Sequence, residues 1–245
     1  MQLNQSNYYS TDANKQYFSV SQYKDFAQCE AMAMAKIADA YKPAMTRAML
    51  VGSFVDSYFE GTLEAFIKEN PAIFTRKNEL RSEFNKANEI IARMKNDELF
   101  MRFMSGEKQR IMTFEMFGVM WKMKMDSYLA KICITDLKVV AKFKTLPFFR
   151  YDIQGAVYQK GVEFVTGDIL PFYLAVGTKE KIIDLDVFQI PQSTLDMALN
   201  EVSINMPRFI EVKNGWVEPK YCGKCDYCKS IKAAKIRNYN ELLEG

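Results

Sequence analysis

The hydrophobic pattern of this chain changes once, near Ser105 and Gly106, and this change limits the folds open to it more than any other feature. Before that point, apolar residues recur at helical spacing among good helix formers, so residues 1–105 are predicted to be mainly helical. After it, apolar residues alternate or run together over strand lengths. The predicted strands cover 110–117, 119–126, 131–138, 170–176 and 182–187, and the predicted helices between and after them cover 150–166 and 192–210. The sequence therefore predicts an α/β chain of the α+β kind, with a helical N-terminal third and three adjacent strands after it.

Four helices are expected in the N-terminal third, after a loop or short strand-like arm over residues 1–18. They cover about 19–37, 43–68, 79–94 and 97–104. Ser19 or Ser21 is expected to cap the first of them, in which Cys29 lies. Pro43 suits the first turn of the second.

The chain contains no histidine, and this excludes several kinds of active site. Histidine-based triads, zinc hydrolases with histidine ligands and imidazole general bases are all ruled out. With 245 residues and 49% hydrophobic content, the chain can form a packed globular core. It has no signal-like start and no apolar run of membrane-spanning length, so a cytoplasmic location is expected.

Two aspartates and a lysine stand out among the predicted strands. Asp126 ends one strand and Asp136 ends the next, so antiparallel neighbours would bring both carboxylates to one edge. Lys138 lies two residues after Asp136, on the same face of its strand. Two carboxylates are enough to hold Mg²⁺ beside a phosphodiester. The lysine can position or help deprotonate the attacking water and can offset charge on the transition state. Taken alone, however, Asp-x-Lys is common on solvent-facing strands.

Further pairs of residues give this motif a context. Gln154 and Tyr158 are spaced i, i+4 and share one face of the helix that follows Lys138. Gly52 and Asp56 have the same spacing in the helix over 43–68. The chain thus carries Gly-x-x-x-acid, Asp, Asp-x-Lys and Gln-x-x-x-Tyr, in that order.

This order resembles the PD-(D/E)XK nuclease superfamily, in particular its RecB-like and RecE-like (exonuclease VIII-like) phage exonucleases, over roughly residues 19–230. The resemblance implies a restriction-endonuclease-like core with a central mixed sheet flanked by helices. It implies that Asp126 and Asp136 bind Mg²⁺ or Mn²⁺ and that Lys138 is the catalytic lysine. Gln154 and Tyr158 would orient the site and contact the DNA backbone.

Asp56 departs from the pattern, because these families usually carry a histidine at its position. An aspartate can still bind a metal directly or through water, so Asp56 is included as a third metal ligand. A single nuclease domain over residues 1–245 is expected, because the chain has no internal repeat and no low-complexity linker. Within it, 106–215 would form the catalytic core, and 216–245 a cysteine-rich segment and a basic helix from Ser230 to about Leu243.

Three of the five cysteines, Cys222, Cys225 and Cys228, have Cys-x-x-Cys-x-x-Cys spacing, which aims three thiolates at one centre. Cys29 is the expected fourth ligand, because Cys133 lies in an apolar strand and is interpreted as a core residue. The layout is similar to iron-sulfur-stapled nucleases of the same superfamily, including AddB-type helicase-nucleases. A [4Fe–4S] cluster is therefore expected, and a structural Cys₄ zinc site is the alternative. The third possibility is four reduced cysteines that bind no metal.

Lys142, Lys144 and Arg150 form a basic cluster among aromatic residues and are candidate DNA contacts, although such clusters are more often solvated surface. The resemblance implies an exonuclease that resects ends of linear double-stranded DNA in phage or prophage recombination or in DNA repair, with a RecT-type annealing protein as partner. The sequence leaves homo-oligomerisation open. Two alternatives remain: a nuclease-fold protein that binds DNA or regulates without turnover, and a zinc-stapled nucleic-acid-binding domain whose working surface is Cys222 to Lys235.

Overall fold

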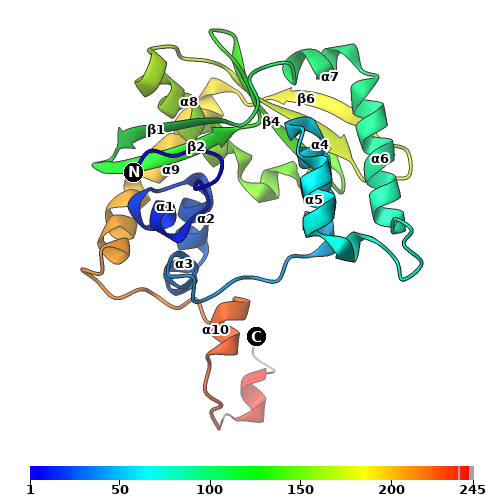
Figure 1. Ribbon diagram of the computed structural model, residues 1–245. Coiled ribbons are helices and arrows are strands. Elements are labelled where there is room, and N and C mark those ends of the chain that lie inside the picture. Colours follow the sequence, from blue (N-terminus) through cyan, green and yellow to red (C-terminus); the bar gives the residue numbers. More distant parts are fainter. Residues whose placement is uncertain (237, 243–245) are drawn as a thin grey trace.

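A four-stranded mixed sheet lies at the centre of the fold, between two groups of helices (Figure 1). This computed structural model describes residues 1–236 and 238–242. The strands are β1 (Arg110–Met116), β2 (Val119–Met125), β3 (Ser127–Leu129), β4 (Cys133–Val140), β5 (Phe172–Thr178) and β6 (Leu185–Gln189). The helices are α1 (Thr11–Gln16), α2 (Val20–Gln28), α3 (Glu30–Ile37), α4 (Arg47–Glu60), α5 (Leu63–Glu69), α6 (Ser82–Lys95), α7 (Glu98–Phe103), α8 (Tyr151–Thr166), α9 (Gln192–Lys213) and α10 (Asp226–Ser230).

The central sheet has the strand order β3-β4-β5-β6. β4 and β5 are parallel and are joined through α8, whereas β3 and β6 pair antiparallel with their neighbours at the two edges. Apolar side chains leave both faces of β4 because helices cover both. Ile134 and Val140 pack in one core cluster with α8 and α9, and Leu137 packs on the opposite face with α4 and α6. The expected mixed sheet flanked by helices is confirmed.

β1 and β2 form a separate antiparallel hairpin and do not join the sheet as two of three adjacent strands. The link is the three-residue strand β3, which sequence analysis missed because it is too short to show a period. Phe114 and Trp121, on the hairpin, are buried in the same core cluster as α8. The hairpin thus covers α8 and carries the chain to the edge of the sheet.

The N-terminal third is helical, as expected, but its helices are shorter than predicted. Residues 11–16 form a helix in what was expected to be an arm, and the helix expected over 19–37 breaks at Cys29, whose backbone is extended. Ser19 caps α2 by accepting a hydrogen bond from the Gln22 amide. The helix expected over 43–68 begins only after the cap residue Thr46 and is interrupted at Gly61, whose φ of 77° ends α4.

The prediction of a basic C-terminal helix from Ser230 to about Leu243 is wrong over the described residues. α10 ends at Ser230, and the chain from Lys232 to Ile236 has no regular structure before a short 3₁₀ turn at Tyr239–Leu242. Leu243, the expected helix end, lies outside the described residues. Across the described ranges, none of the helices combines the length and the hydropathy of a membrane-spanning segment.

Gly161 and Gly52 allow a matched test of this packing, because both lie inside helices. A Cβ atom at Gly161 would overlap the ring of Phe114, whereas one at Gly52 would meet no atom within 4 Å. Gly161→Ala is expected to destabilise the fold by about 1–3 kcal/mol, since the buried ring of Phe114 cannot move aside freely. Gly52→Ala is expected to stabilise it by about 0.5–1 kcal/mol, because alanine is the better helix former. Urea unfolding of both variants measures the difference, and equal midpoints would contradict the packing of α8 on β1.

Candidate functional site

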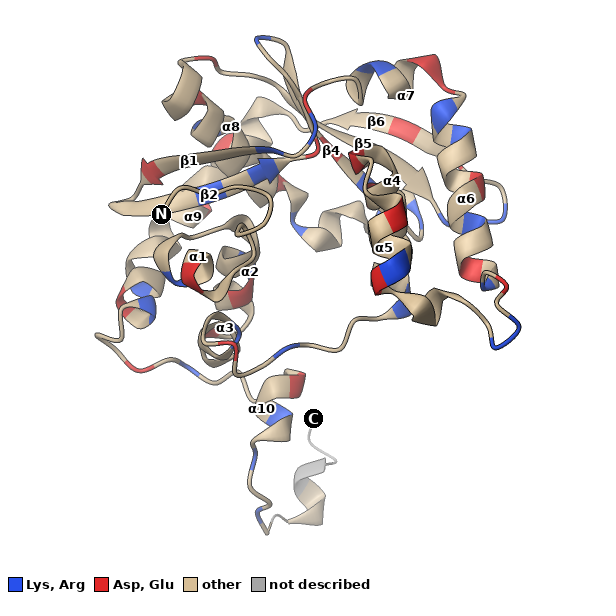
Figure 2. Cartoon of the chain, viewed as in Figure 1, with Lys and Arg blue, Asp and Glu red and all other residues tan. Residues whose placement is uncertain are grey.

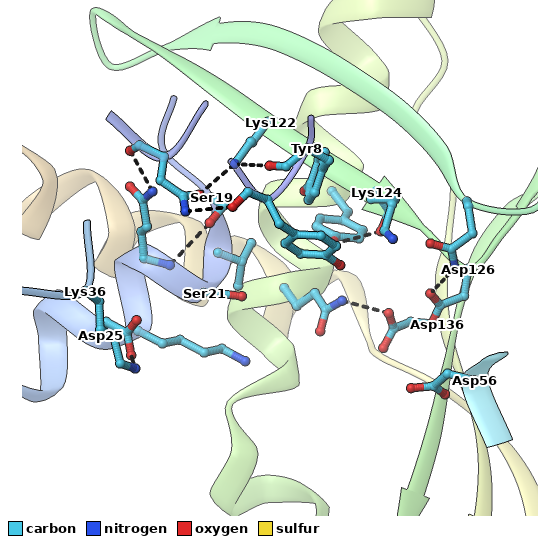
Figure 3. A pocket seen from close by; sticks show the side chains of 18 of the residues that line it. Tyr8, Ser19, Ser21, Asp25, Lys36, Asp56, Lys122, Lys124, Asp126 and Asp136 are labelled. Atoms are coloured by element: carbon cyan, nitrogen blue, oxygen red, sulfur yellow. Dashed lines mark hydrogen bonds and ion pairs between the residues drawn. The ribbon is translucent and has the colours of Figure 1, made fainter. Parts of the chain in front are cut away.

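An open cavity of about 470 Å³ lies where α2, α4, α8, β2 and β4 meet. The six residues singled out by the sequence motifs for their polar side chains all line it: Asp56, Asp126, Asp136, Lys138, Gln154 and Tyr158. Figure 3 shows Asp56, Asp126 and Asp136 on one wall, opposite Ser19, Ser21 and Lys36. Residues separated by about a hundred positions in the sequence thus share one site.

Asp136 was expected at the end of its strand, but it lies in the middle of β4. It is only 2% exposed, because helices cover both faces of the strand. Its Oδ1 accepts a hydrogen bond of 2.7 Å from Gln154 Nε2, and its Oδ2 forms an ion pair with the Lys138 ammonium. Burial, together with the nearby charge of Asp126, raises the pKa of Asp136 to about 7, against the opposing effect of Lys138.

Asp126 follows β2 and immediately precedes β3. The two acids meet because β3, and not β2, pairs antiparallel with β4, placing Ser127 opposite Thr135. Oδ2 of Asp126 accepts a 2.9 Å hydrogen bond from the Leu137 amide. Oδ1 accepts one of 3.2 Å from Gln109 Nε2. These two bonds hold the Asp126 carboxylate beside β4.

Asp56 brings a third carboxylate from α4. Burial raises its pKa well above the usual range, and the charge of Asp126 adds to this effect. Burial alone would lower the pKa of Lys138, but the carboxylates of Asp136 and Asp126 outweigh it and raise that pKa above its ordinary value. The lysine ammonium is therefore held charged among carboxylates that repel one another.

Gln154 and Tyr158 project from the same face of α8, one turn apart, as their spacing predicts. The Tyr158 hydroxyl donates a hydrogen bond of 3.1 Å to the Lys124 carbonyl of β2. Burial, followed by the charge of Asp136, raises the pKa of this hydroxyl. Gln154 fixes the rotamer of Asp136, while Tyr158 fixes α8 against the hairpin.

The donor set fits a hard divalent cation. Asp56, Asp126 and Asp136 offer only oxygen atoms, which Mg²⁺ and Mn²⁺ prefer. Asp136 Oδ2 is buried, and the partner it has among the described residues is the Lys138 ammonium. A cation here would offset the repulsion among the three acids.

Four lysines besides Lys138 also line the cavity; we call them the basic wall, and sequence analysis missed them. One of them, Lys36, is paired with Asp25, which lines the cavity as well. Lys24 and Lys36 reach the cavity from α2 and α3, and Lys122 and Lys124 reach it from β2. Figure 2 shows basic residues along β2 and acidic ones where β4 passes α4. Burial lowers the pKa of Lys24 to about 8. The signal that could have revealed this wall is the pair of lysines at alternate positions in the otherwise apolar strand β2.

Gln109 was also missed. It is buried just before β1, with a positive φ of 52°, and its side chain reaches Asp126 while Gln5 donates a 2.7 Å hydrogen bond to its carbonyl. Its Oε1 accepts no hydrogen bond from any described residue. No local pattern marks such a residue, because its role depends on a contact with the turn after β2.

Lys142, Lys144 and Arg150, the candidate DNA contacts, do not line this cavity. Arg150 forms ion pairs with Asp152 and Glu201, each shorter than 3.0 Å. These three residues lie on or beside the 3₁₀ turn before α8, and all are exposed.

The four cysteines expected to share a metal lie together, away from the cavity. The Sγ atoms of Cys29, Cys222, Cys225 and Cys228 are all within 4.8 Å of one another. Backbone amides of Cys225 and Lys224 donate to Cys222 Sγ and lower its pKa to about 6, whereas burial raises the pKa of Cys228 to about 12. Cys133 is buried in β4, outside this group. The set of four thiols fits a thiophilic metal.

Comparisons with known proteins place this chain in a family. Residues 19–231 match the family described as a PDDEXK-like domain of unknown function (DUF3799). A crystal structure of a "putative exonuclease" from Eubacterium rectale is 46% identical, and the match covers 100% of this chain and 99% of that one with a TM-score of 0.96. The structure of a protein named SSO0001 is 14% identical, covering 97% of this chain and 100% of that one, and its TM-score of 0.36 supports no argument. No curated protein sequence matches. Since the family match spans most of its length, this chain belongs to the PDDEXK-like DUF3799 family, and its mixed α/β fold is that of a PD-(D/E)XK nuclease.

Proposed function

We propose that this protein is a metal-dependent exodeoxyribonuclease that hydrolyses phosphodiester bonds at the ends of linear double-stranded DNA. The observation that carries the proposal is the cavity that three carboxylates and Lys138 share with four further lysines. The acidic wall can hold Mg²⁺ or Mn²⁺, and the basic wall can hold DNA phosphates. The similarity to a protein described as an exonuclease supports action at ends.

The residues on the acidic wall have separable roles in this proposal. Asp56, Asp126 and Asp136 would hold the cation, which when bound polarises the scissile phosphate and lowers the pKa of a water. Lys138 keeps its proton because of the surrounding carboxylates, so its ammonium stabilises negative charge on the phosphate and does not act as a base. Gln154 holds the rotamer of Asp136.

The resemblance to RecE-like nucleases extends the proposal to the biological setting. The single-stranded tail left by resection would be taken by a RecT-type annealing protein in phage or prophage recombination, inside the bacterial cell. The proposed nuclease domain spans residues 1–245, and its state of assembly is a further point for experiment.

A time course on labelled DNA tests the proposed activity. Linear duplex, covalently closed circular duplex and single-stranded DNA of the same sequence are incubated with Mg²⁺, with Mn²⁺ and with EDTA. Linear duplex is expected to release mononucleotides or short products, whereas the closed circle stays intact and EDTA stops the reaction. Cutting of the closed circle would show an endonuclease instead, and intact linear DNA under every metal condition would overturn nuclease activity.

A second candidate function is DNA binding without turnover, and the aspartate at position 56 favours it. The resemblance places a histidine there, and the substitution adds another negative charge to a site that already holds two buried or half-buried acids. Under this reading, linear duplex would be bound but never degraded, so a gel-shift measurement beside the time course distinguishes the two functions.

Gln109 is a positioning residue in this proposal, because its side-chain amide donates to Asp126, one of the proposed metal ligands. Gln109→Ala is expected to raise the Mg²⁺ concentration for half-maximal activity by about 10-fold or more, as loss of a metal ligand's partner commonly does. The activity at saturating Mg²⁺ should fall much less. A Mg²⁺ titration measures this, and Gln5→Ala, which removes only the bond to the Gln109 carbonyl, provides the control. Equal Mg²⁺ dependence in wild type and Gln109→Ala would show that Gln109 has no such role.

A further inference from the structure

The four clustered cysteines come from two distant segments with different local structure. Cys29 occupies the break between α2 and α3, where its extended backbone turns Sγ toward the C-terminal segment. Cys222 and Cys225 flank a tight turn in which Gly223 has a φ of 71°. Cys225 then caps α10, and Cys228 lies in its first turn. Three sulfurs are thus presented at regular spacing, and the fourth comes from 199 residues before the last of them.

The spacing of the sulfur atoms distinguishes between metals. Cys29 Sγ lies 3.6 Å from Cys228 Sγ, and Cys222 Sγ lies 3.9 Å from it, with all four sulfurs within 4.8 Å of one another. A single tetrahedral zinc ion with bonds of about 2.3 Å holds its four sulfurs about 3.8 Å apart. In a [4Fe–4S] cluster each cysteine binds a different iron, which sets the sulfurs roughly 6 Å apart. The observed spacing fits one ion and leaves no room for a cluster between the thiols.

The surroundings oppose any widening of this site. Cys29 and Cys228 are 3% and 5% exposed and pack with Ala31 and Met32. Hydrogen bonds between the segments lie directly beside the sulfurs. The Ala31 amide donates to the Lys220 carbonyl at 3.1 Å, and the Lys220 amide donates to Glu30 Oε2 at 2.7 Å. Moving the two segments apart to admit a cluster would stretch these bonds.

Glu30 reinforces the same junction from a second side. Its carboxylate accepts hydrogen bonds from Arg208 of α9 at 3.1 and 2.9 Å. The C-terminal segment is therefore fixed to the break between α2 and α3 by polar contacts that are independent of the sulfurs. The four thiols complete a junction that is already shaped to hold them close together.

We infer that Cys29, Cys222, Cys225 and Cys228 bind one structural Zn²⁺ ion, in place of the iron-sulfur cluster expected from the sequence. With four protein ligands the ion has no open position, so it fastens the C-terminal segment to the α2–α3 break and takes no part in catalysis. This inference does not depend on the proposed nuclease activity.

Metal analysis of the full-length protein tests the inference. The protein is expressed with iron and zinc both supplied, purified without oxygen, and analysed for zinc, iron and acid-labile sulfide. The expected result is zinc equimolar with the chain, no sulfide and no visible absorbance; replacement of zinc by Co²⁺ should give the intense visible bands of a tetrahedral thiolate site. Iron and sulfide in cluster proportions would overturn the inference, and so would a folded protein free of metal with four reactive thiols.

Variants locate the zinc ion within the chain. Cys225→Ser is expected to lose the zinc, whereas Cys133→Ser, which replaces the buried cysteine outside the group, retains it. Asp136→Asn should also retain it, since the carboxylate cavity is a separate site. Zinc retained in Cys225→Ser but lost in Asp136→Asn would place the ion in the cavity and refute the assignment. If Cys225→Ser does not fold, the wild-type metal content and the Co²⁺ spectrum decide alone.

Discussion

Asp136→Asn is expected to abolish metal-dependent DNA degradation, with a fall in rate on the order of 10³-fold, without unfolding the protein. The substitution keeps the shape of the side chain and one oxygen that can accept from Gln154. It removes the negative charge at the centre of the proposed metal site. The rate is measured on linear duplex DNA under single-turnover conditions with saturating Mg²⁺.

The same variant separates a catalytic role from a structural one. Burial of the Asp136 carboxylate opposes folding of the metal-free protein, whereas its ion pair with Lys138 favours folding. Because these effects have opposite signs, the melting temperature of Asp136→Asn without metal is expected to stay close to that of wild type. Asp186→Asn is the matched control, because Asp186 lies on β6 of the same sheet but is exposed. Full activity in Asp136→Asn, or an equal loss in Asp186→Asn, would refute the proposed site.

Cys228→Ser is expected to cause the largest loss of stability among single substitutions outside the cavity. Structural zinc sites bind with about 10–16 kcal/mol, and part of that free energy stabilises the fold. A loss of about 3–5 kcal/mol would lower the melting temperature by roughly 10 °C in a chain of this size. Thermal unfolding of wild type, of Cys228→Ser and of Cys133→Ser measures the effect, and only Cys228→Ser should show it.

Hydrogen exchange shows where that stability is lost. The Ala31 amide should exchange faster in Cys228→Ser, because its bond to the Lys220 carbonyl depends on the C-terminal segment staying docked. The amides of β4 and β5 should be unaffected, since they lie in the centre of the sheet. Uniform protection in both proteins would mean that the four thiols do not hold the segment in place.

The residues that sequence reasoning could place are those fixed by local spacing. Lys138 and Asp136 share a face because strands have a period of two, and Gln154 and Tyr158 share one because helices bring i and i+4 together. The grouping of Asp56 with these residues followed from the resemblance alone, since α4 and β4 are far apart in the sequence. Cys29 was expected beside the other three cysteines, but only the folded chain shows that the four lie together.

What could not be predicted depends on contacts between distant segments. The helix expected over 19–37 breaks at Cys29, where hydrogen bonds to Lys220 compete with the continuation of the helix. β3 is too short for periodicity, yet it is the strand that sets Asp126 beside β4. The role of Gln109 comes from a turn 17 residues later in the chain.

The break at Cys29 also has a consequence for the order in which the chain matures during synthesis. α2 and its cap residue Ser19 line the cavity, and the helix ends at Cys29, whose partner Cys228 is made 199 residues later. The residues of the acidic wall have all been translated once α8 is complete, but the junction that fixes the end of α2 cannot close until Cys228 has been translated. A nascent or truncated chain that lacks Cys228 would therefore carry the three carboxylates while the end of α2 is not yet fixed to the C-terminal segment.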